Sequence, residues 1–323
     1  MALVQRVIQT LQMTITPSRT PHARKWRTRC VSIVARASLL ATISWAPCAS
    51  AQMLDSLAGT TLEYYPSARA GGPTKQLAVG VFRAHGAIPV MLGASTIFLP
   101  GVSYERVELD GRGLASPAPT LHAPMLNLTL VQKVSDRLSL VLSLGYGIAS
   151  DFGGPLGKDD FVVTNMVLGV YKLSDSVSLG GGILYDRRTG SVGPLPVVPI
   201  NWRISENARL RGVIPASVAI EYRAAPWLAV GIRGAYDGNR YHLSENSYGV
   251  AHMQLAYSAI SVGPKMTAYL ADFVNVDVYL GVPVYRRYAA YVDGDQIASE
   301  QLTPVVGGGI RVWIGDSKWD SPR

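Results

Sequence analysis

Two stretches near the middle of the chain alternate between apolar residues and small or polar ones. In residues 125–146, leucines occupy alternate positions on both sides of a Ser-Asp dipeptide at 135–136. Residues 166–185 repeat this arrangement around a second Ser-Asp dipeptide at 174–175. Successive side chains of a strand point to opposite faces of a sheet, so each stretch is predicted to form two strands joined by a tight turn. Leucine at alternate positions of long strands is typical of a sheet face that contacts lipid.

The apolar face of the second stretch is expected to carry Met166, Leu168 and Val170. Upstream, alternation through Leu77, Val79 and Val81 predicts a strand at 76–84. The remaining strands are expected around the following ranges: 60–65, 91–108, 196–204, 208–214, 216–223, 228–232, 250–269, 274–284 and 303–314. Counting from residue 91 gives 12 strands, and the strands at 76–84 and 60–65 would raise the number to 14. Both even numbers suit a bacterial outer-membrane barrel.

The predicted turns share a motif. Lys133-Val-Ser-Asp-Arg-Leu-Ser-Leu140 is echoed from Lys172 and from Arg203, with looser versions starting at Arg223 and Tyr269. The connections between these turns are longer and more variable. Short turns on one side and long loops on the other are the signature of an outer-membrane barrel, with the short turns in the periplasm. We therefore predict an all-β fold, a transmembrane antiparallel up-and-down barrel of about 12 strands, or 14.

Two other all-β folds fit less well. The motifs start at 133, 172, 203, 223 and 269, so their spacings of 39, 31, 20 and 46 residues vary widely. A β-propeller needs a steadier blade length of about 40 residues. A lipocalin-like barrel needs only about eight strands, and this chain is too long for one.

Composition agrees with an all-β protein and excludes several functions. The 323 residues include 32 glycines and 16 tyrosines, and only 16% are charged. Seven of the 30 basic residues precede Gln52 and no acidic residue does, which leaves 23 basic against 22 acidic residues and gives no sign of a nucleic-acid partner. Both cysteines, Cys30 and Cys48, also precede Gln52, so disulfides and thiol chemistry are not expected in the main body.

The N-terminal segment resembles an export signal. A basic block at 24–29 precedes a mostly apolar stretch at 31–45, and Ala49-Ser50-Ala51 supplies a small-x-small cleavage pattern. The alternative is an uncleaved helix or tail. We expect a signal peptide at 1–51, a lead-in segment at 52–74, the barrel at 75–314 and a polar C-terminal tail at 315–323.

Polar residues on the faces opposite the apolar ones are candidates for the barrel lumen. They are Arg209, Arg211, Glu221, Arg223, Arg233, Asp237, Asp277 and Arg311. One interpretation is a slightly cationic pore lining that favours small anions. The other is that opposite charges pair and fill the barrel, as Glu221 could with one of the arginines. We prefer the second interpretation, because small barrels are usually packed with side chains.

Aromatic residues near predicted strand ends support a membrane location, because aromatic belts form at the lipid–water boundary. They are Tyr146, Tyr171, Tyr185, Trp202, Tyr222, Trp227, Tyr241, Tyr269 and Tyr285.

Catalysis has one candidate. His242 lies close to Ser244 and Glu245 in a predicted loop, but nearness in sequence does not create the geometry of a triad. The chain has no Gly-x-Ser-x-Gly and no His-Glu-x-x-His motif. We assign no catalytic, cofactor-binding or metal-binding residue, and expect no cofactor.

Several short segments resemble a known family. They are Leu195-Pro196-Val197, Asn201-Trp202-Arg203, Pro215, Glu221-Tyr222-Arg223, Asp237-Gly238 and Arg240-Tyr241. From about residue 77 to 314 the chain is similar to a family of bacterial outer-membrane β-barrel proteins catalogued as a domain of unknown function. The resemblance implies the outer membrane of a Gram-negative bacterium and supplies no activity. One departure is that Trp313-Ile314 is followed by a polar tail, whereas such barrels usually finish on an aromatic residue.

The leading expectation is therefore a passive role, as a narrow porin-like channel or a structural outer-membrane protein. The alternative is an outer-membrane enzyme, a lipid or peptide hydrolase or an acyltransferase, acting at the extracellular loops. Expected partners are outer-membrane lipid, the barrel-assembly machinery and small anionic solutes.

Overall fold

The computed structural model describes residues 57–69, 76–112, 119–186, 194–271, 273–302 and 304–314. The expected signal peptide, residues 52–56 and 70–74 of the lead-in segment, and the polar tail lie outside the described residues.

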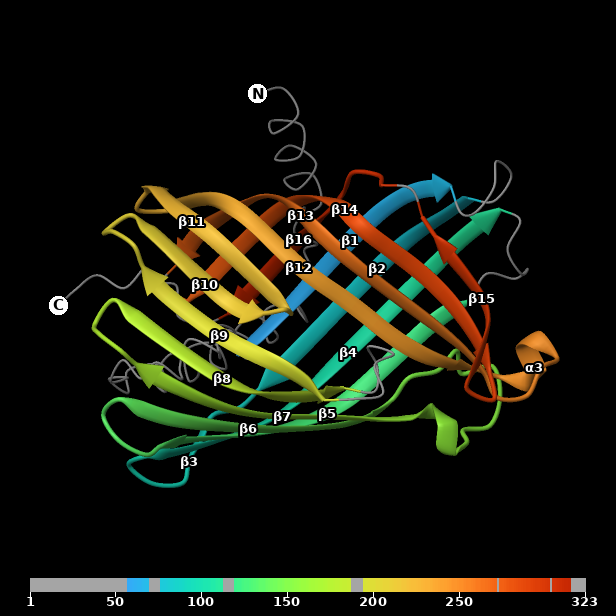
Figure 1. Ribbon diagram of the computed structural model, residues 1–323, viewed down its shortest axis with the longest axis horizontal. Helices are drawn as coiled ribbons and strands as arrows, with labels where there is room; N and C mark the ends of the chain where they lie inside the picture. The colour runs from blue at the N-terminus through green and yellow to red at the C-terminus, as the bar shows by residue number, and fades with distance from the viewer. Residues whose placement is uncertain are drawn as a thin grey trace, which may run out of the picture. The chain divides into compact units, whose positions relative to one another are not determined.

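The described chain forms one antiparallel sheet that closes into a barrel of 14 strands (Figure 1). Each strand pairs with the next, and β16 returns to pair with β1 from Ala58–Ile314 to Tyr64–Gly308. The strands of the ring are β1 (Ala58–Arg69), β2 (Gln76–Ala87), β4 (Thr96–Arg112), β5 (Thr120–Lys133), β6 (Leu138–Ile148), β7 (Phe161–Lys172), β8 (Val177–Asp186), β9 (Leu195–Arg203), β10 (Ala208–Ile214), β11 (Ser217–Ala225), β12 (Leu228–Leu243), β13 (Met253–Ala271), β14 (Val274–Val292) and β16 (Gly307–Ile314). Two short strands, β3 (Val90–Met91) and β15 (Asp295–Gln301), pair with β4 and β14. The higher of the two predicted strand numbers is confirmed.

The barrel begins before the expected boundary at residue 75 and includes the strand expected at 60–65. Its first strand starts at Ala58, inside the segment expected to be a lead-in up to residue 74. Closure explains the difference, because β1 supplies the backbone partners for β16 on one side and for β2 on the other.

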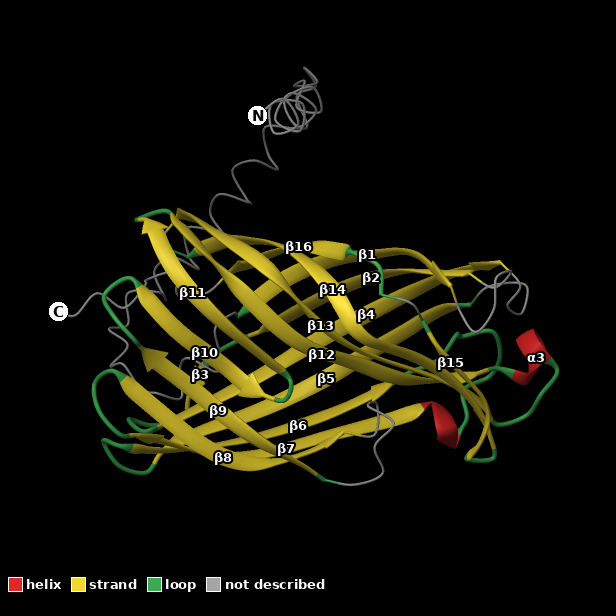
Figure 2. Cartoon of the chain, turned by 45° about the horizontal axis from the view of Figure 1, so that its top comes forward, coloured by secondary structure: helices red, strands yellow, loops and turns green. Residues whose placement is uncertain are grey.

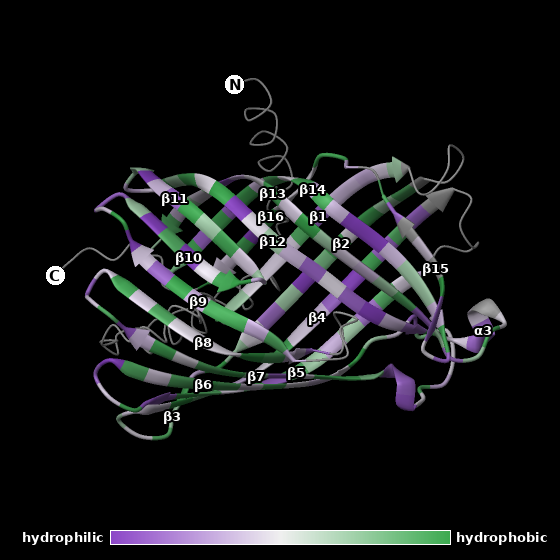
Figure 3. Cartoon of the chain, viewed as in Figure 1, coloured by the Kyte–Doolittle hydropathy of each residue, from purple (hydrophilic) through white to green (hydrophobic). Residues whose placement is uncertain are grey.

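Strand faces alternate as predicted on most of the barrel (Figure 3). Leu126, Leu140 and Ile310 point outward, with 47%, 44% and 52% of their surface exposed. Their inward neighbours Val131 and Val141 are almost fully buried. A closed barrel with an apolar outer face is the arrangement of transmembrane β-barrels.

Two strands turn their apolar residues inward instead, against expectation. Leu168 and Val170 of β7 are buried, and it is Val167 that is exposed on the outer face. On β2, Val79 and Val81 are likewise buried in the interior. Both strands have apolar residues on each face, and the interior offers apolar partners, so the pattern alone did not identify the outward side.

The interior contains two clusters of packed apolar side chains. One, the β4–β9 cluster, consists of Leu99, Val131, Val141, Leu168 and Val197. The other, the loop-end cluster, consists of Ala68, Leu77, Val79, Val81, Val107, Leu109, Leu121, Ala123, Met125, Ala149, Val162, Tyr241, Leu243, Tyr257, Tyr288 and Leu302. The loop-end cluster joins strands from both ends of the sequence across the lumen.

The repeated turn motif has a local cause. In the first turn, the Ser135 hydroxyl accepts hydrogen bonds from the backbone N–H groups of Arg137 and Leu138, at 3.2 and 3.0 Å. Lys133 then pairs with Asp136 at 2.8 Å, and this contact lowers the pKa of the Asp136 carboxyl. The turn after β7 repeats both features with Ser174 and with the Lys172–Asp175 pair. In both turns the serine hydroxyl accepts hydrogen bonds from the backbone of the turn, and the aspartate pairs with the lysine three residues before it. We refer to this end of the barrel as the short-turn end.

The opposite end carries the longer connections and is called the loop end. The short helices η2 (Lys158–Asp160) and α3 (Glu245–Tyr248) both lie there (Figure 2). Within the described ranges, the helices are too short and too polar to cross a membrane. Strand length varies strongly around the ring, from 7 residues in β10 to 19 in β14.

The inward position of Leu168 gives a first testable prediction. Leu168→Ala removes a fully buried side chain and is expected to lower the free energy of unfolding by about 2–5 kcal/mol. Leu140→Ala on the neighbouring strand makes the same change on the outer face and is expected to cost clearly less. Urea unfolding of both variants in detergent micelles measures the difference. Equal losses would contradict the inward orientation of Leu168.

Candidate functional site

By strand register, the eight residues predicted to line the lumen lie on the same face of the sheet as the buried Glu221, and they fall into separate groups. Arg209, Arg211 and Glu221 come together near the short-turn end, with Asp277 close by. The others lie apart from this group. Arg233 stacks on Tyr279 at 4.7 Å, Arg311 stacks on Trp313 at 5.5 Å, Arg223 bonds to the Asn207 side chain at 3.4 Å, and Asp237 pairs with Arg83 at 3.3 Å.

Glu221 is the centre of the first group, which we call the Glu221 cluster. Its carboxylate accepts bonds from Arg209 Nε at 2.8 Å, Arg211 Nε at 3.0 Å and Lys265 Nζ at 2.8 Å. Lys265 also approaches Asp277 at 3.4 Å. Only 2% of the Glu221 side chain is exposed, so three cations surround a carboxylate that has left water. A buried charge is tolerated when it is paired and hydrogen-bonded, which these contacts provide.

A second polar group, the Arg83 cluster, spans the lumen at mid-height. Arg83 contacts Glu105 at 2.5 Å, Glu63 at 3.1 Å and Asp237 at 3.3 Å. It also donates to the Tyr257 hydroxyl at 3.1 Å. These bonds connect β1, β2 and β4 on one side of the barrel with β12 and β13 on the other.

Further hydrogen bonds complete the Arg83 cluster. Asn239 donates to Glu105 at 2.6 Å, and the Tyr241 hydroxyl donates to the same carboxylate. The Tyr279 hydroxyl of β14 donates to Glu63. The two tyrosines thus act as donors inside the barrel. The aromatic pattern predicts Tyr241 and Tyr269 in an interfacial belt, but both instead bond to charged side chains. The Tyr269 hydroxyl accepts a hydrogen bond from Arg209 at 3.1 Å.

Sequence reasoning missed the Arg83 cluster. The available signal was that Arg83 and His85 continue the period-2 face of Leu77, Val79 and Val81 on β2. A face that ends in two polar residues is better suited to an interior than to lipid. Glu63 and Glu105 occupy the equivalent faces of the neighbouring strands, because they pair with Val81 and Arg83.

At the loop end, residues 149–151 connect β5 and β12, which are not neighbours in the ring. His122 of β5 exchanges two backbone hydrogen bonds with Ser150, at 2.8 and 3.0 Å. His242 of β12 bonds to the flanking residues, through its N–H to Ala149 at 2.9 Å and through its carbonyl to the Asp151 N–H at 3.2 Å. β5 and β12 are therefore linked at this level. Strands β6 to β11, which lie between them in the sheet, do not contribute to the barrel wall at the loop end.

The histidine singled out from the sequence lies beside this bridge. His242 Nδ1 and Asp160 Oδ1 are 3.0 Å apart, and Asp160 is buried. The Ser244 hydroxyl instead bonds to Asp151 at 3.1 Å and to Ser247 at 2.8 Å. The structure thus places His242 against a carboxylate and engages Ser244 with other partners.

Within the described ranges, no group of three or more His, Cys, Asp or Glu side chains could hold a metal ion.

The barrel was compared with solved structures. An outer membrane channel from Pseudomonas putida F1 aligns over 84% of this chain and 100% of its own, with 10% sequence identity and a TM-score of 0.43. The NanC porin aligns over 80% of this chain and 98% of its own, with 9% identity and a TM-score of 0.35. LpxR from Salmonella typhimurium aligns over 79% and 99%, with 8% identity and a TM-score of 0.34.

A search of the curated proteins gives no match. The comparison with family models matches residues 101–293 to one described as "Domain of unknown function (DUF6268)". The matched segment runs from β4 to the end of β14 and covers more than half of the sequence, so the chain belongs to the DUF6268 family.

Proposed function

We propose that this protein is an integral barrel of the bacterial outer membrane whose lumen is closed at rest, and that it serves as a structural membrane protein and not as an open porin. Support for the membrane location comes from the outer face. Large apolar side chains such as Leu62, Val102 and Val284 are exposed there by 61%, 63% and 59%. A closed ring also leaves no free sheet edge, which is what a spanning β-structure requires.

The observation that carries the closed state is the loop-end cluster. At that level the bridge at 149–151 joins β5 to β12, so that β1, β2, β4, β5, β12, β13, β14 and β15 form a continuous run of paired strands. A barrel of about eight strands has an interior just wide enough to be filled by side chains. Tyr241, Leu121 and Val107 fill it here, each with 1% exposure or less. A barrel of 14 strands is thus reduced to a packed one before it reaches the loop end.

The Arg83 cluster closes the next layer. It lies beside the loop-end cluster and shares Tyr241 and Tyr257 with it. The cavity beside it, lined by Glu63, Asp237 and Arg286 among others, has a volume of about 10 Å³. That is room for about one water molecule and too little for a solute path.

A narrow anion channel is the second candidate, and the Glu221 cluster favours it. Three cations, Arg209, Arg211 and Lys265, face two carboxylates, Glu221 and Asp277, so the lumen wall near the short-turn end has an excess of positive charge. Rings of cationic side chains select for anions. Such a channel would conduct only after the loop-end cluster had moved.

Conductance in a planar bilayer tests the closed state. The refolded mature chain is expected to give no stable single-channel steps, because the packed layer excludes water. Tyr241→Ala together with Tyr257→Ala removes two large interior side chains and is expected to produce discrete steps. Tyr146→Ala, on the outer face, is the matched control and is expected to stay silent.

Folding of each protein is checked by the heat-dependent shift of the barrel in gel electrophoresis. Stable steps from the unmodified, folded chain would refute the closed lumen. Failure of the unmodified chain to insert into bilayers would refute the membrane location itself.

The second candidate is tested in the opened double variant. Arg211→Gln removes one cation while Glu221 keeps Arg209 and Lys265 as partners, so the barrel is expected to fold. The reversal potential in a salt gradient is expected to move toward the cation equilibrium potential, because the excess positive charge of the wall falls. Arg106→Gln, which changes an exposed arginine paired with Glu108, is expected to leave the reversal potential unchanged. An unchanged value in Arg211→Gln would exclude the cluster as a selectivity element.

A further inference from the structure

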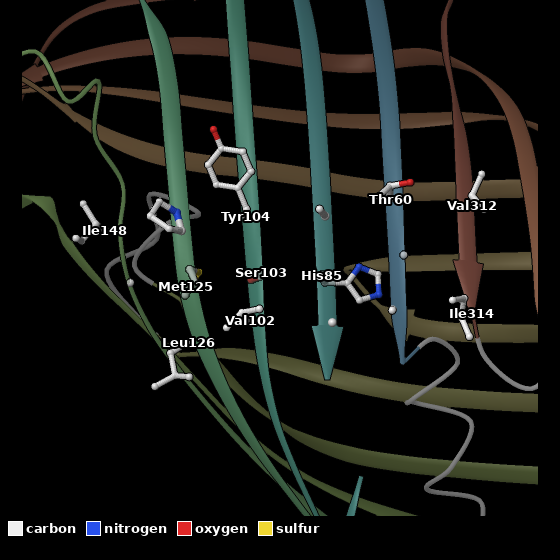
Figure 4. Close-up of a pocket in the computed structure, with 16 residues that line it drawn as sticks. Thr60, His85, Val102, Ser103, Tyr104, Met125, Leu126, Ile148, Val312 and Ile314 are labelled. Atoms are coloured by element: carbon white, nitrogen blue, oxygen red, sulfur yellow. The ribbon is translucent and has the colours of Figure 1, made fainter. Parts of the chain in front are cut away.

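The outer face of the barrel carries an apolar groove that the proposed function does not use. It has a volume of about 900 Å³ and crosses six neighbouring strands, from β16 through β1, β2, β4 and β5 to β6. Figure 4 shows its labelled side chains along these strands, with Val312 and Ile314 at one side and Leu126 and Ile148 at the other. Its lining is almost entirely apolar.

The groove arises from side-chain size. Its floor is made by small outward residues of β1 and β2: Ala58, its register partner Gly86, and Ala84. Larger outward residues border it, among them Val102, which is 63% exposed, and Ile314, which is 46% exposed. A Cβ atom added at Gly86 would meet no atom within 4 Å, so the space above this glycine is open.

Polar groups occupy the end of the groove that lies nearer the loops. Tyr104 lines the groove, and its hydroxyl is 2.7 Å from His122 Nδ1. The His122 ring also contacts the edge of Phe152, with 5.7 Å between ring centres. Arg106 pairs with His122 in the strand register and has 46% of its side chain exposed, although it contacts Glu108 at 2.5 Å. An aromatic and cationic boundary of this kind is found where strands leave the hydrocarbon layer.

We propose that the groove binds one acyl chain of a phosphate-bearing lipid from the leaflet at the loop end, with the phosphate held at Arg106 and His122. This inference rests on the proposed membrane location. Three features support it: the groove is continuous with the apolar outer face, its lining is apolar along its length, and the exposed cation Arg106 lies two residues beyond Tyr104 on β4, toward the loop end. Arginine is well suited to phosphate, because it can donate two parallel hydrogen bonds.

The shape of the groove favours a chain over a second barrel. Small floor residues set between larger neighbours form a trough that a flexible hydrocarbon chain can enter. The outer wall of another barrel carries broad rows of exposed side chains and would cover the trough without filling it. The volume also lies within the range of sites that hold one ligand of moderate size.

Two glycines allow a matched test. Gly86 and Gly181 both lie within strands on the outer face, and at both an added Cβ meets no atom within 4 Å. Gly181 on β8 lies outside the groove. Gly86→Phe therefore fills the groove without a steric clash, and Gly181→Phe places the same ring on the outer face elsewhere.

The measurement is native mass spectrometry of the full barrel in detergent, titrated with phosphatidylglycerol and, separately, with phosphatidylcholine. The unmodified protein is expected to retain one phosphatidylglycerol molecule and to bind it in preference to phosphatidylcholine. Gly86→Phe is expected to weaken this binding by about tenfold or more, and Gly181→Phe to leave it unchanged. Arg106→Gln is expected to remove the preference for the anionic lipid and to keep the acyl-chain contact.

Equal lipid binding by the Gly86→Phe and Gly181→Phe variants would overturn the proposal. So would a dimer of the unmodified chain that dissociates in Gly86→Phe but persists in Gly181→Phe. The heat-dependent gel shift and insertion into vesicles are recorded for every variant. A chain that fails to insert contradicts the proposed membrane location, whereas a chain that inserts but shows no groove-dependent binding contradicts only the lipid site.

Discussion

Backbone hydrogen bonding around the ring is the constraint on which the rest of this structure depends. Inside a hydrocarbon layer, each unpaired N–H or C=O group costs several kcal/mol, so a sheet can span only if it closes. Closure here depends on seven residue pairs between β1 and β16, at opposite ends of the described chain. All strands between them must then keep a consistent register. That register brings Arg83 and Glu105 of the paired strands β2 and β4 together with Asp237 of β12, which is far from them in sequence.

A ring of this size creates a second requirement, since its interior is wider than side chains alone can fill. The chain meets this in two ways. Near the short-turn end, charged side chains reach inward and form ion pairs around Glu221. Toward the loop end, the bridge through Ser150 draws β5 and β12 together, and apolar side chains then pack across the smaller ring. In the proposed closed state, these polar and apolar layers replace the water that would occupy an open lumen.

Sequence alone predicted the strands and turns well, because a period of two and the Ser-Asp motif are both local signals. The orientation of a strand was predictable where one face is mainly polar or small, as on β6 and β14. It failed on β7, where Val167 and Leu168 are both apolar and only the packing partners decide which one faces inward.

Among the charged residues, Arg209, Arg211 and Glu221 lie on adjacent strands of one hairpin, so their proximity followed from a short turn. The partners of Arg83 come from β1, β4, β12 and β13, and the groove combines residues of β16 with residues of β1 to β6. Neither arrangement can be derived without the register of the closed ring.

The uneven lengths of the strands have a consequence for the surrounding lipid. A tilted strand needs about 9–11 residues to cross the hydrocarbon layer, whereas β10 has only 7 and β14 has 19. The wall is therefore low on one side and high on the other. Hydrophobic mismatch of this kind is relieved by thinning of the adjacent bilayer or by tilting of the protein. In the proposed membrane location, a barrel built in this way would thin the bilayer on the side of β10 and leave it thicker beside β14.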